Sequence, residues 1–431
     1  MICNNLSINE QGHLCLAGVD ATVLAEKYGT PLYLMDENRI RRQCRIYKKA
    51  MKEAFGEVSA PLYASKAASF KQIYRIMKEE GMGIDVVSAG EIYTAKSAGF
   101  PLEKAYFHSN NKTDEDIAYA IDSGIGCFVV DNAEELVVID RIAGERAVIQ
   151  TVLLRLTPGI DPHTYEAVAT GKVDSKFGSA IETGQAEEIT KFALSLSNIH
   201  LAGFHCHVGS QVFDSDVFIQ SADIMLEFIK EMEQKHGYKT EILDLGGGYG
   251  VRYLDTDPEI DIAENIHIVG SHVREKCLAL AIELPAIHLE PGRSIVADAG
   301  MTLYTVGTVK KIPGYKNYVS IDGGMADNPR YALYKSPYTI LPVVKSDAEA
   351  FVCSLVGRCC ESGDIIQEDI ALPSDIKRGD LVAVLTTGAY NYSMASNYNR
   401  LTRPPIVMLK DGNDSLAVKR ESLADLCMND L

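Results

Sequence analysis

Between residues 60 and 290, short apolar runs alternate with longer segments in which apolar residues recur every three or four positions. Short apolar runs are typical of buried strands, and the wider spacing is typical of helices with one buried face. Eight such runs lie at 61–65, 83–87, 105–109, 126–130, 151–156, 201–206, 241–245 and 286–290. Strands separated by helices form parallel sheets, so the pattern predicts a (β/α)8 barrel, with an open doubly wound sheet as the alternative.

After about residue 300, the helical spacing gives way to short segments in which apolar and polar residues alternate, as in half-buried strands. These segments lie at 302–312, 316–322, 338–344, 350–357, 380–387, 404–410 and 416–420. We therefore predict an α/β plus all-β protein, with a TIM-type barrel and a C-terminal β-domain of barrel or sandwich form. The expected divisions are an N-terminal segment over 1–36 that adds strands to the β-domain, the barrel over 37–295, and the β-domain over 296–431.

Composition narrows the function classes. The chain has 431 residues and a net charge of −17, which repels nucleic acid phosphates and anionic membrane surfaces. No apolar run reaches the ~20 residues that a membrane helix needs. The ten cysteines are scattered without a C-x-x-C pair, so neither a disulfide framework nor a metal site is indicated. We expect a cytoplasmic protein with a small-molecule substrate and without metal.

The working residues of such barrels follow the strands, so the segments after them are examined for chemistry. Lys66 follows the first strand, where partial burial would lower its pKa and make it a nucleophile; an ordinary surface lysine is the alternative. His207 follows the sixth strand and could lie over a flat ring, or could simply be satisfied by backbone partners. Ser210, close by, could help to bind an anion.

The last two strands are followed by groups that suit a phosphate. Gly246, Gly247 and Gly248 could point backbone amides at a phosphate, or could form a tight turn. Glu290 and Arg293 add a carboxylate and a guanidinium, or a structural ion pair. Together with a lysine and a stacking histidine, this set matches pyridoxal phosphate, whose pyridine nitrogen a carboxylate can hold protonated.

Two adjacent cysteines, Cys359 and Cys360, stand out in the β-domain. Neighbouring cysteines suit neither an easy disulfide nor a tetrahedral metal clip. One of them could be a catalytic thiol, and two small core residues are the alternative.

At these residues, and over nearly the whole length, the chain resembles the diaminopimelate decarboxylase family of fold-type III pyridoxal phosphate enzymes. The shared segments are YASKA, GIDVVSAGE, HSNNK, TGKVDSKFG, HCHVGSQ, LDLGGGYG, EPGRS, NPRYALY, CESGD and GAYNYSMASNYN. The CESGD and SMASNYN segments indicate the diaminopimelate branch. One departure is that Pro329 precedes Arg330, where the family pattern places a proline after the arginine.

The resemblance implies a role for each matching residue. Lys66 corresponds to the lysine that joins the cofactor, His207 to the residue stacked on its ring, and Glu290 to the partner of its pyridine nitrogen. The implied proton donor is Cys360. Further cofactor contacts fall on Ser210, Gly246, Gly247, Gly248, Gly292, Arg293 and Tyr390, and substrate contacts on Arg293, Arg330, Tyr334, Glu361 and Tyr390.

The implied activity is decarboxylation of meso-2,6-diaminopimelate to L-lysine, the last step of lysine biosynthesis. The family also implies a homodimer whose active sites are shared across the interface. The alternatives are a decarboxylase of carboxynorspermidine, arginine or ornithine, a racemase, or a non-catalytic pyridoxal phosphate carrier. The β-domain with its CESGD segment argues against a carrier, which has no use for a positioned proton donor.

Overall fold

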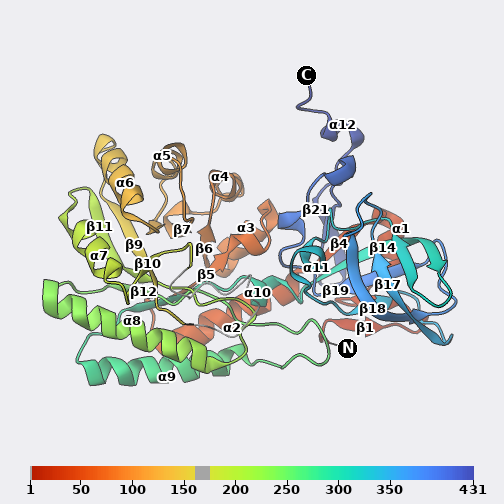
Figure 1. Cartoon of the computed structure of the whole chain (residues 1–431), viewed down its shortest axis with the longest axis horizontal. Helices are drawn as coiled ribbons and strands as arrows, with labels where there is room; N and C mark the ends of the chain where they lie inside the picture. Colours follow the sequence, from red (N-terminus) through yellow and green to blue (C-terminus); the bar gives the residue numbers. More distant parts are fainter. Residues whose placement is uncertain (1, 161–174) are drawn as a thin grey trace. The chain divides into compact units, whose positions relative to one another are not determined.

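The computed structural model describes residues 2–160 and 175–431, and these form two compact units (Figure 1). One unit comprises residues 43–250 and 259–292 and contains the barrel. The other comprises residues up to 42, residues 251–258 and residues 293–431, and contains the β-sheets.

Eight parallel strands form the barrel within the described part of the chain. They are β5 (Ala60–Ala64), β6 (Gly83–Val86), β7 (Ala105–Phe107), β8 (Cys127–Val130), β9 (Gln150–Thr157), β11 (Ile199–His205), β12 (Ile242–Asp244) and β13 (Ala286–Leu289). Their order is β9-β11-β12-β13-β5-β6-β7-β8, and pairing of β8 with β9 closes the ring. The closure confirms the predicted barrel and excludes the open sheet. A two-residue strand, β10 (Ser179–Ala180), extends the sheet beside β9.

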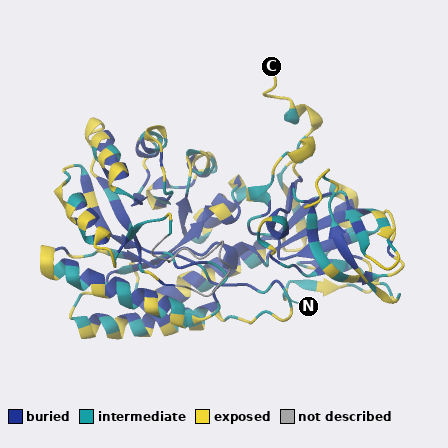
Figure 2. Cartoon of the chain, in the orientation of Figure 1, coloured by how far each residue is buried: buried dark blue, intermediate teal, exposed yellow. Residues whose placement is uncertain are grey.

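Helices separate the barrel strands, as their spacing predicts. They are α2 (Glu37–Phe55), α3 (Lys71–Glu80), α4 (Ala89–Ser97), α5 (Asp114–Asp122), α6 (Ala133–Glu145), α7 (Gln185–Ser195), α8 (Ser215–His236) and α9 (Ile262–Leu280). Side chains fix several of their starts: Ser88 caps α4, and Thr113 forms a reciprocal capping box with Asp116 on α5. Figure 2 shows the strands buried and the helices exposed along one side.

The second unit is built on a mixed sheet of nine described strands. Its strands are β4 (Leu32–Asp36), β14 (Gly300–Lys311), β15 (Asn317–Ile321), β16 (Ile340–Pro342), β17 (Ala350–Val356), β18 (Ile365–Pro373), β19 (Leu381–Leu385), β20 (Ile406–Lys410) and β21 (Asn413–Val418). The alternation of residues predicts every one of the C-terminal strands except β18. Short helices, α10 (Arg293–Val296), α11 (Arg330–Tyr334) and α12 (Leu423–Leu426), interrupt this sequence.

The N-terminal segment contributes to this unit, as expected. Strand β4 pairs antiparallel with β14 and parallel with β20. The earlier strands β1 (Leu6–Ile8), β2 (Leu14–Leu16) and β3 (Val19–Asp20) form a small sheet of their own, followed by α1 (Ala21–Tyr28). Buried leucines from both ends of the chain share one core, among them Leu14, Leu34, Leu303 and Leu409. No helix in the described ranges combines the length and the apolarity needed to cross a membrane.

Candidate active site

Each group predicted at the barrel mouth follows the carboxyl end of a strand. Lys66 follows β5, and His207 follows β11. Residues 246–248 follow β12, and Glu290 follows β13. His108, which the sequence reasoning did not single out, follows β7. Because the strands are parallel, all these groups belong to the same end of the barrel.

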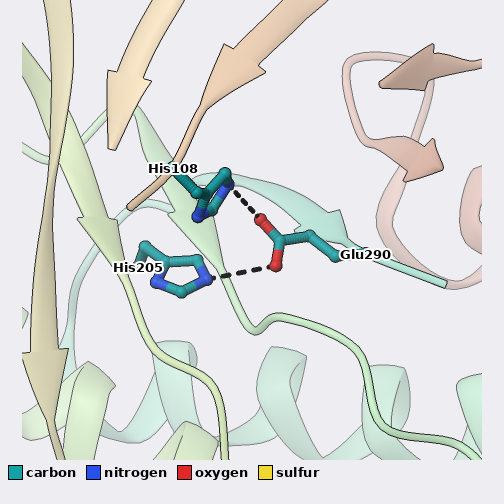
Figure 3. Close-up of side chains that lie close together, drawn as sticks. All are labelled: His108, His205 and Glu290. Atoms are coloured by element: carbon teal, nitrogen blue, oxygen red, sulfur yellow. Dashed lines mark hydrogen bonds and ion pairs between the residues drawn. The ribbon is translucent and has the colours of Figure 1, made fainter. Parts of the chain in front are cut away.

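Two histidines bracket the buried carboxylate of Glu290, one at each oxygen (Figure 3). Nε2 of His108 lies 2.7 Å from Oε1, and Nε2 of His205 lies 3.2 Å from Oε2. All three side chains are buried, and the two imidazole rings meet edge to face at 4.9 Å. The potential ligand atoms of these three residues also lie close enough together to hold a metal ion.

The imidazoles decide which buried acid is ionised. Burial works to raise the pKa of Glu290, but His108 and His205 hold that pKa well below its ordinary value. The pKa values of Asp85 and Asp244 are instead raised, chiefly by burial. Burial also lowers the pKa of His205 to about 4, so this ring is neutral near pH 7. Glu290 is therefore the anion of this cluster.

Lys66 lies in a single 3-10 turn, η1 (Ser65–Ala67), between two buried residues. Its side chain is exposed. The partial burial that the sequence reasoning expected is therefore wrong, because the turn places only its neighbours in the interior.

His207 and the glycine loop contact each other. Nδ1 of His207 accepts the backbone N–H of Gly247 at 3.2 Å, and burial, followed by the charges of Lys66 and Arg155, keeps the pKa of His207 well below its usual value. The ring is therefore neutral and has a backbone partner, which does not conflict with stacking on a cofactor. The backbone N–H of Gly246 donates to Asp244 at 2.8 Å. Two of the three glycine N–H groups therefore donate hydrogen bonds to side chains of the chain itself.

Glycine is required at positions in this loop where other atoms lie too close to the backbone to leave room for a Cβ atom. A Cβ on Gly247 would lie 2.0 Å from the carbonyl oxygen of Glu290, and one on Gly248 would lie 2.3 Å from that of Gly209. Gly246 has a φ of +69°, which side chains disfavour. Gly292 packs similarly, with its missing Cβ 3.0 Å from the Cβ of Ala64. Ser210, partly buried, lies in the loop that these glycines approach.

In the other unit, two buried arginines converge on Tyr253. Arg293 donates to the hydroxyl of Tyr253 at 2.7 Å and lies 4.8 Å from the centre of the Tyr390 ring. The guanidinium of Arg330 lies 4.8 Å from the Tyr253 ring centre. Burial opposes ionisation of Tyr253, but the two guanidiniums lower its pKa overall. Three predicted substrate residues, Arg293, Arg330 and Tyr390, are thereby brought together.

Arg330 is buried without a carboxylate partner in the part of the chain that is described. It donates to the hydroxyls of Tyr338 at 2.9 Å and Ser336 at 3.2 Å. A buried guanidinium held only by hydroxyls and aromatic rings retains its full positive charge, which suits a ligand carboxylate. The unusual Pro329 immediately precedes helix α11, at its N-cap position. The departure from the family pattern therefore coincides with the start of the helix that carries Arg330.

Residues 357–364, which include the CESGD segment, form the loop between β17 and β18, and two side chains accept backbone N–H groups of this loop. Oδ2 of Asp364, which is buried, accepts the N–H of Cys359 at 2.7 Å. Oδ1 of Asn399 accepts the N–H of Cys360 at 2.7 Å. Cys360 is exposed, and so is Glu361. The alternative that both cysteines are core residues is therefore wrong for Cys360.

The remaining predicted residues lie apart from the Tyr253 cluster. Tyr334 is partly buried at the end of α11. No described contact joins Tyr334, Cys360 or Glu361 to Tyr253 within one chain. Of the TGKVDSKFG segment, residues 170–174 lie outside the described residues; Phe177 lies 4.3 Å from the guanidinium of Arg155.

Sequence reasoning missed His108, His205, Tyr253 and Tyr338. A signal existed for the histidines: His108 opens the HSNNK segment after a predicted strand, and His205 lies two residues before His207. Tyr253 follows the glycine loop by five residues, but its place beside the arginines depends on residues 251–258 leaving the barrel for the other unit. Local sequence carries no signal for that.

The chain is similar to known proteins over nearly its whole length. Residues 37–297 match the family model described as pyridoxal-dependent decarboxylase, pyridoxal binding domain. The diaminopimelate decarboxylase of Bacillus subtilis (strain 168) is 44% identical over 98% of this chain and 96% of its own. That of Staphylococcus aureus (strain COL) is 43% identical over 98% of both chains.

The structural comparison covers both units. The crystal structure of diaminopimelate decarboxylase from M. jannaschii in complex with L-lysine matches with a TM-score of 0.91 and 35% identity, over 99% of this chain and 98% of that one. The chain therefore belongs to the pyridoxal-dependent decarboxylases, within their diaminopimelate decarboxylase group.

Proposed function

We propose that this chain decarboxylates meso-2,6-diaminopimelate to L-lysine and carbon dioxide, with pyridoxal phosphate as its cofactor. The observation that supports the reaction class is the buried carboxylate of Glu290 at the barrel mouth, with His108 at one oxygen and His205 at the other. The full-length similarity to diaminopimelate decarboxylases supports the substrate.

The barrel residues fit the cofactor chemically. When bound, pyridoxal phosphate supplies an electron sink for the electrons left by the departing carboxylate. An ionised carboxylate such as Glu290 stabilises a proton on the pyridine nitrogen, and the primary amine of Lys66 is the kind of group that reacts with an aldehyde. The neutral ring of His207 can lie against an aromatic face. The glycine loop, Ser210, Gly292, Arg293 and Tyr390 complete the proposed cofactor site.

Recognition of the substrate is assigned to the second unit. Diaminopimelate carries an amino acid group at each end, so its binding needs a cation for the distal carboxylate and an anion for the distal ammonium. Arg330, buried and without a carboxylate partner in the described chain, suits the carboxylate. Glu361 suits the ammonium, while Arg293, Tyr334 and Tyr390 complete the set. A substrate without the distal carboxylate would leave Arg330 unpaired, which disfavours it strongly.

Cys360 is the proposed proton donor to the carbon that loses its carboxylate. Its thiol is exposed and its backbone is held by Asn399. We infer a homodimer in which each chain presents this loop to the site of its partner. Residues 37–295 would then bind the cofactor, and residues 296–431, together with the strands of 1–36, would supply substrate and proton-donor residues. All ten cysteines are free thiols, which supports a reducing, cytoplasmic location.

The test combines activity with chemical trapping. The purified chain with pyridoxal phosphate should release carbon dioxide from meso-diaminopimelate, and much less from lysine, ornithine or arginine. Borohydride reduction and peptide mapping should place the cofactor on Lys66; Lys66→Ala should abolish the adduct, while the exposed control Lys71→Ala should retain it. Cofactor on another lysine contradicts the assignment of Lys66, and full turnover of diaminopimelate by Arg330→Ala contradicts that of Arg330.

A further inference from the structure

The two imidazoles around Glu290 come from distant parts of the barrel. His108 follows β7, His205 ends β11, and Glu290 follows β13. None of these three strands pairs with another of the three. The contacts therefore reach across the barrel interior, and neither histidine is needed to hold two neighbouring strands together.

Each oxygen of the carboxylate has its own imidazole, at 2.7 Å and 3.2 Å (Figure 3). A glutamate side chain held at only one oxygen can still rotate about its last torsion, whereas one held at both cannot. The backbone is fixed as well, because the N–H of Glu290 donates to the carbonyl of Gly246 at 2.8 Å. His205 is within hydrogen-bond distance of one oxygen, and His108 is within ion-pair distance of the other.

We propose that His108 and His205 are positioning residues that hold Glu290 as an ionised, pre-oriented partner for the pyridine nitrogen of the cofactor. This inference rests on the proposed function and adds to it the two residues that orient Glu290 for contact with the pyridine nitrogen. Neither histidine needs to contact the substrate.

Two buried acids near Glu290 explain why the histidines are needed to keep Glu290 ionised. Asp85 is buried, and its Oδ1 lies 3.9 Å from Nε2 of His108, beyond hydrogen-bond distance. Asp244 is also buried and accepts the N–H of Gly246. Three carboxyl groups buried together cannot all ionise, since like charges repel strongly away from water. His108 lies closer to Glu290 than to Asp85, and His205 contacts Glu290 at 3.2 Å, which favours Glu290 as the ionised acid in agreement with its lowered pKa.

The test compares two ligands that differ only at the atom in question. Equilibrium dialysis gives the dissociation constants of pyridoxal phosphate and of its 1-deaza analogue, in which carbon replaces the pyridine nitrogen. Wild type should prefer pyridoxal phosphate, and His108→Ala or His205→Ala should reduce that preference on the order of ten-fold, as expected for the loss of one polar contact to a charged group. His108→Gln, which retains a donor, should recover part of it.

A matched control lies on β13, the strand that Glu290 follows. His288 is buried and packs edge-on against Tyr106, with ring centroids 5.4 Å apart. In the described part of the chain it makes no hydrogen bond or ion pair with Glu290, so His288→Gln should keep the wild-type preference. Circular dichroism should verify that each variant is folded, and the glutamine variant at the same position replaces any alanine variant that is not. An unchanged preference in folded variants at both His108 and His205 overturns the positioning role while leaving cofactor binding intact. Failure of wild type to bind pyridoxal phosphate overturns the proposed function with it.

Discussion

Replacement of Lys112 by methionine should destabilise the barrel severely. Its Nζ lies 2.7 Å from Oε1 of Glu135 and 2.8 Å from the carbonyl oxygen of Val129, and both charged side chains are almost completely buried. Burial lowers the pKa of Lys112 and raises that of Glu135, so each charge depends on the other. Removing one partner of a buried pair strands the other charge away from water, and we expect Lys112→Met to cost about 3–5 kcal/mol.

The double variant separates the charge effect from simple loss of packing. Glu135→Gln keeps an acceptor for the N–H of Asp131, now at 3.1 Å, but removes the charge. In the double variant Lys112→Met/Glu135→Gln no charge remains unpaired. Its loss of unfolding free energy should therefore be smaller than the sum of the losses in the two single variants, by about 2 kcal/mol or more. Urea unfolding followed by circular dichroism measures all three. Additive losses would refute the reasoning, and Arg141→Ala, which breaks an exposed pair, should cost less than about 1 kcal/mol.

Three further outcomes are expected. Iodoacetamide at pH 8 should modify Cys360 before Cys359, because burial and Asp364 raise the pKa of the Cys359 thiol to about 12. Fragment-ion spectra of the peptide distinguish the two sites, and equal labelling of both cysteines would contradict this prediction. Asp364→Ala should cost about 2 kcal/mol or more in urea unfolding, since it removes the acceptor of two backbone N–H groups at 2.5 and 2.7 Å; a loss below about 0.5 kcal/mol argues against it. Burial raises the pKa of Asp327 to about 7, so the native state binds its proton more tightly than the unfolded chain does, and this stabilising contribution is lost as the pH rises from about 4 through 7. Asp327→Asn should therefore flatten the stability profile between pH 5 and 7.5, and an unchanged slope counts against the assignment.

Much of the fold follows from spacing along the chain. The eight barrel strands are predictable because they are short apolar runs, and segments with helical spacing lie between them. Strand β18 was missed because Gln367, Glu368 and Asp369 interrupt its apolar residues, and its strand conformation depends on pairing with β17. Propensity yields to tertiary pairing at such a strand.

The candidate site was predictable where one residue follows one strand, as for Lys66 and Glu290. It was not predictable where the chemistry depends on two residues meeting. The ionised state of Glu290 depends on His108 and His205, which lie 182 and 85 positions away by sequence number. The Tyr253 cluster likewise joins separate stretches of one unit. Strand position is a local property, whereas a pKa is set by whatever the fold brings near.

The nine-stranded sheet combines strands from both ends of the chain, and this has a consequence for its synthesis. Strand β4 is complete when the ribosome has added residue 36, but its partners β14 and β20 begin at residues 300 and 406. At ~5–20 residues per second, the apolar β4 waits on the order of tens of seconds for its neighbours. The whole barrel is translated during that interval. The nascent chain therefore carries an unpaired hydrophobic strand while the barrel is made, and a strand with an unpaired edge is prone to pair with other chains.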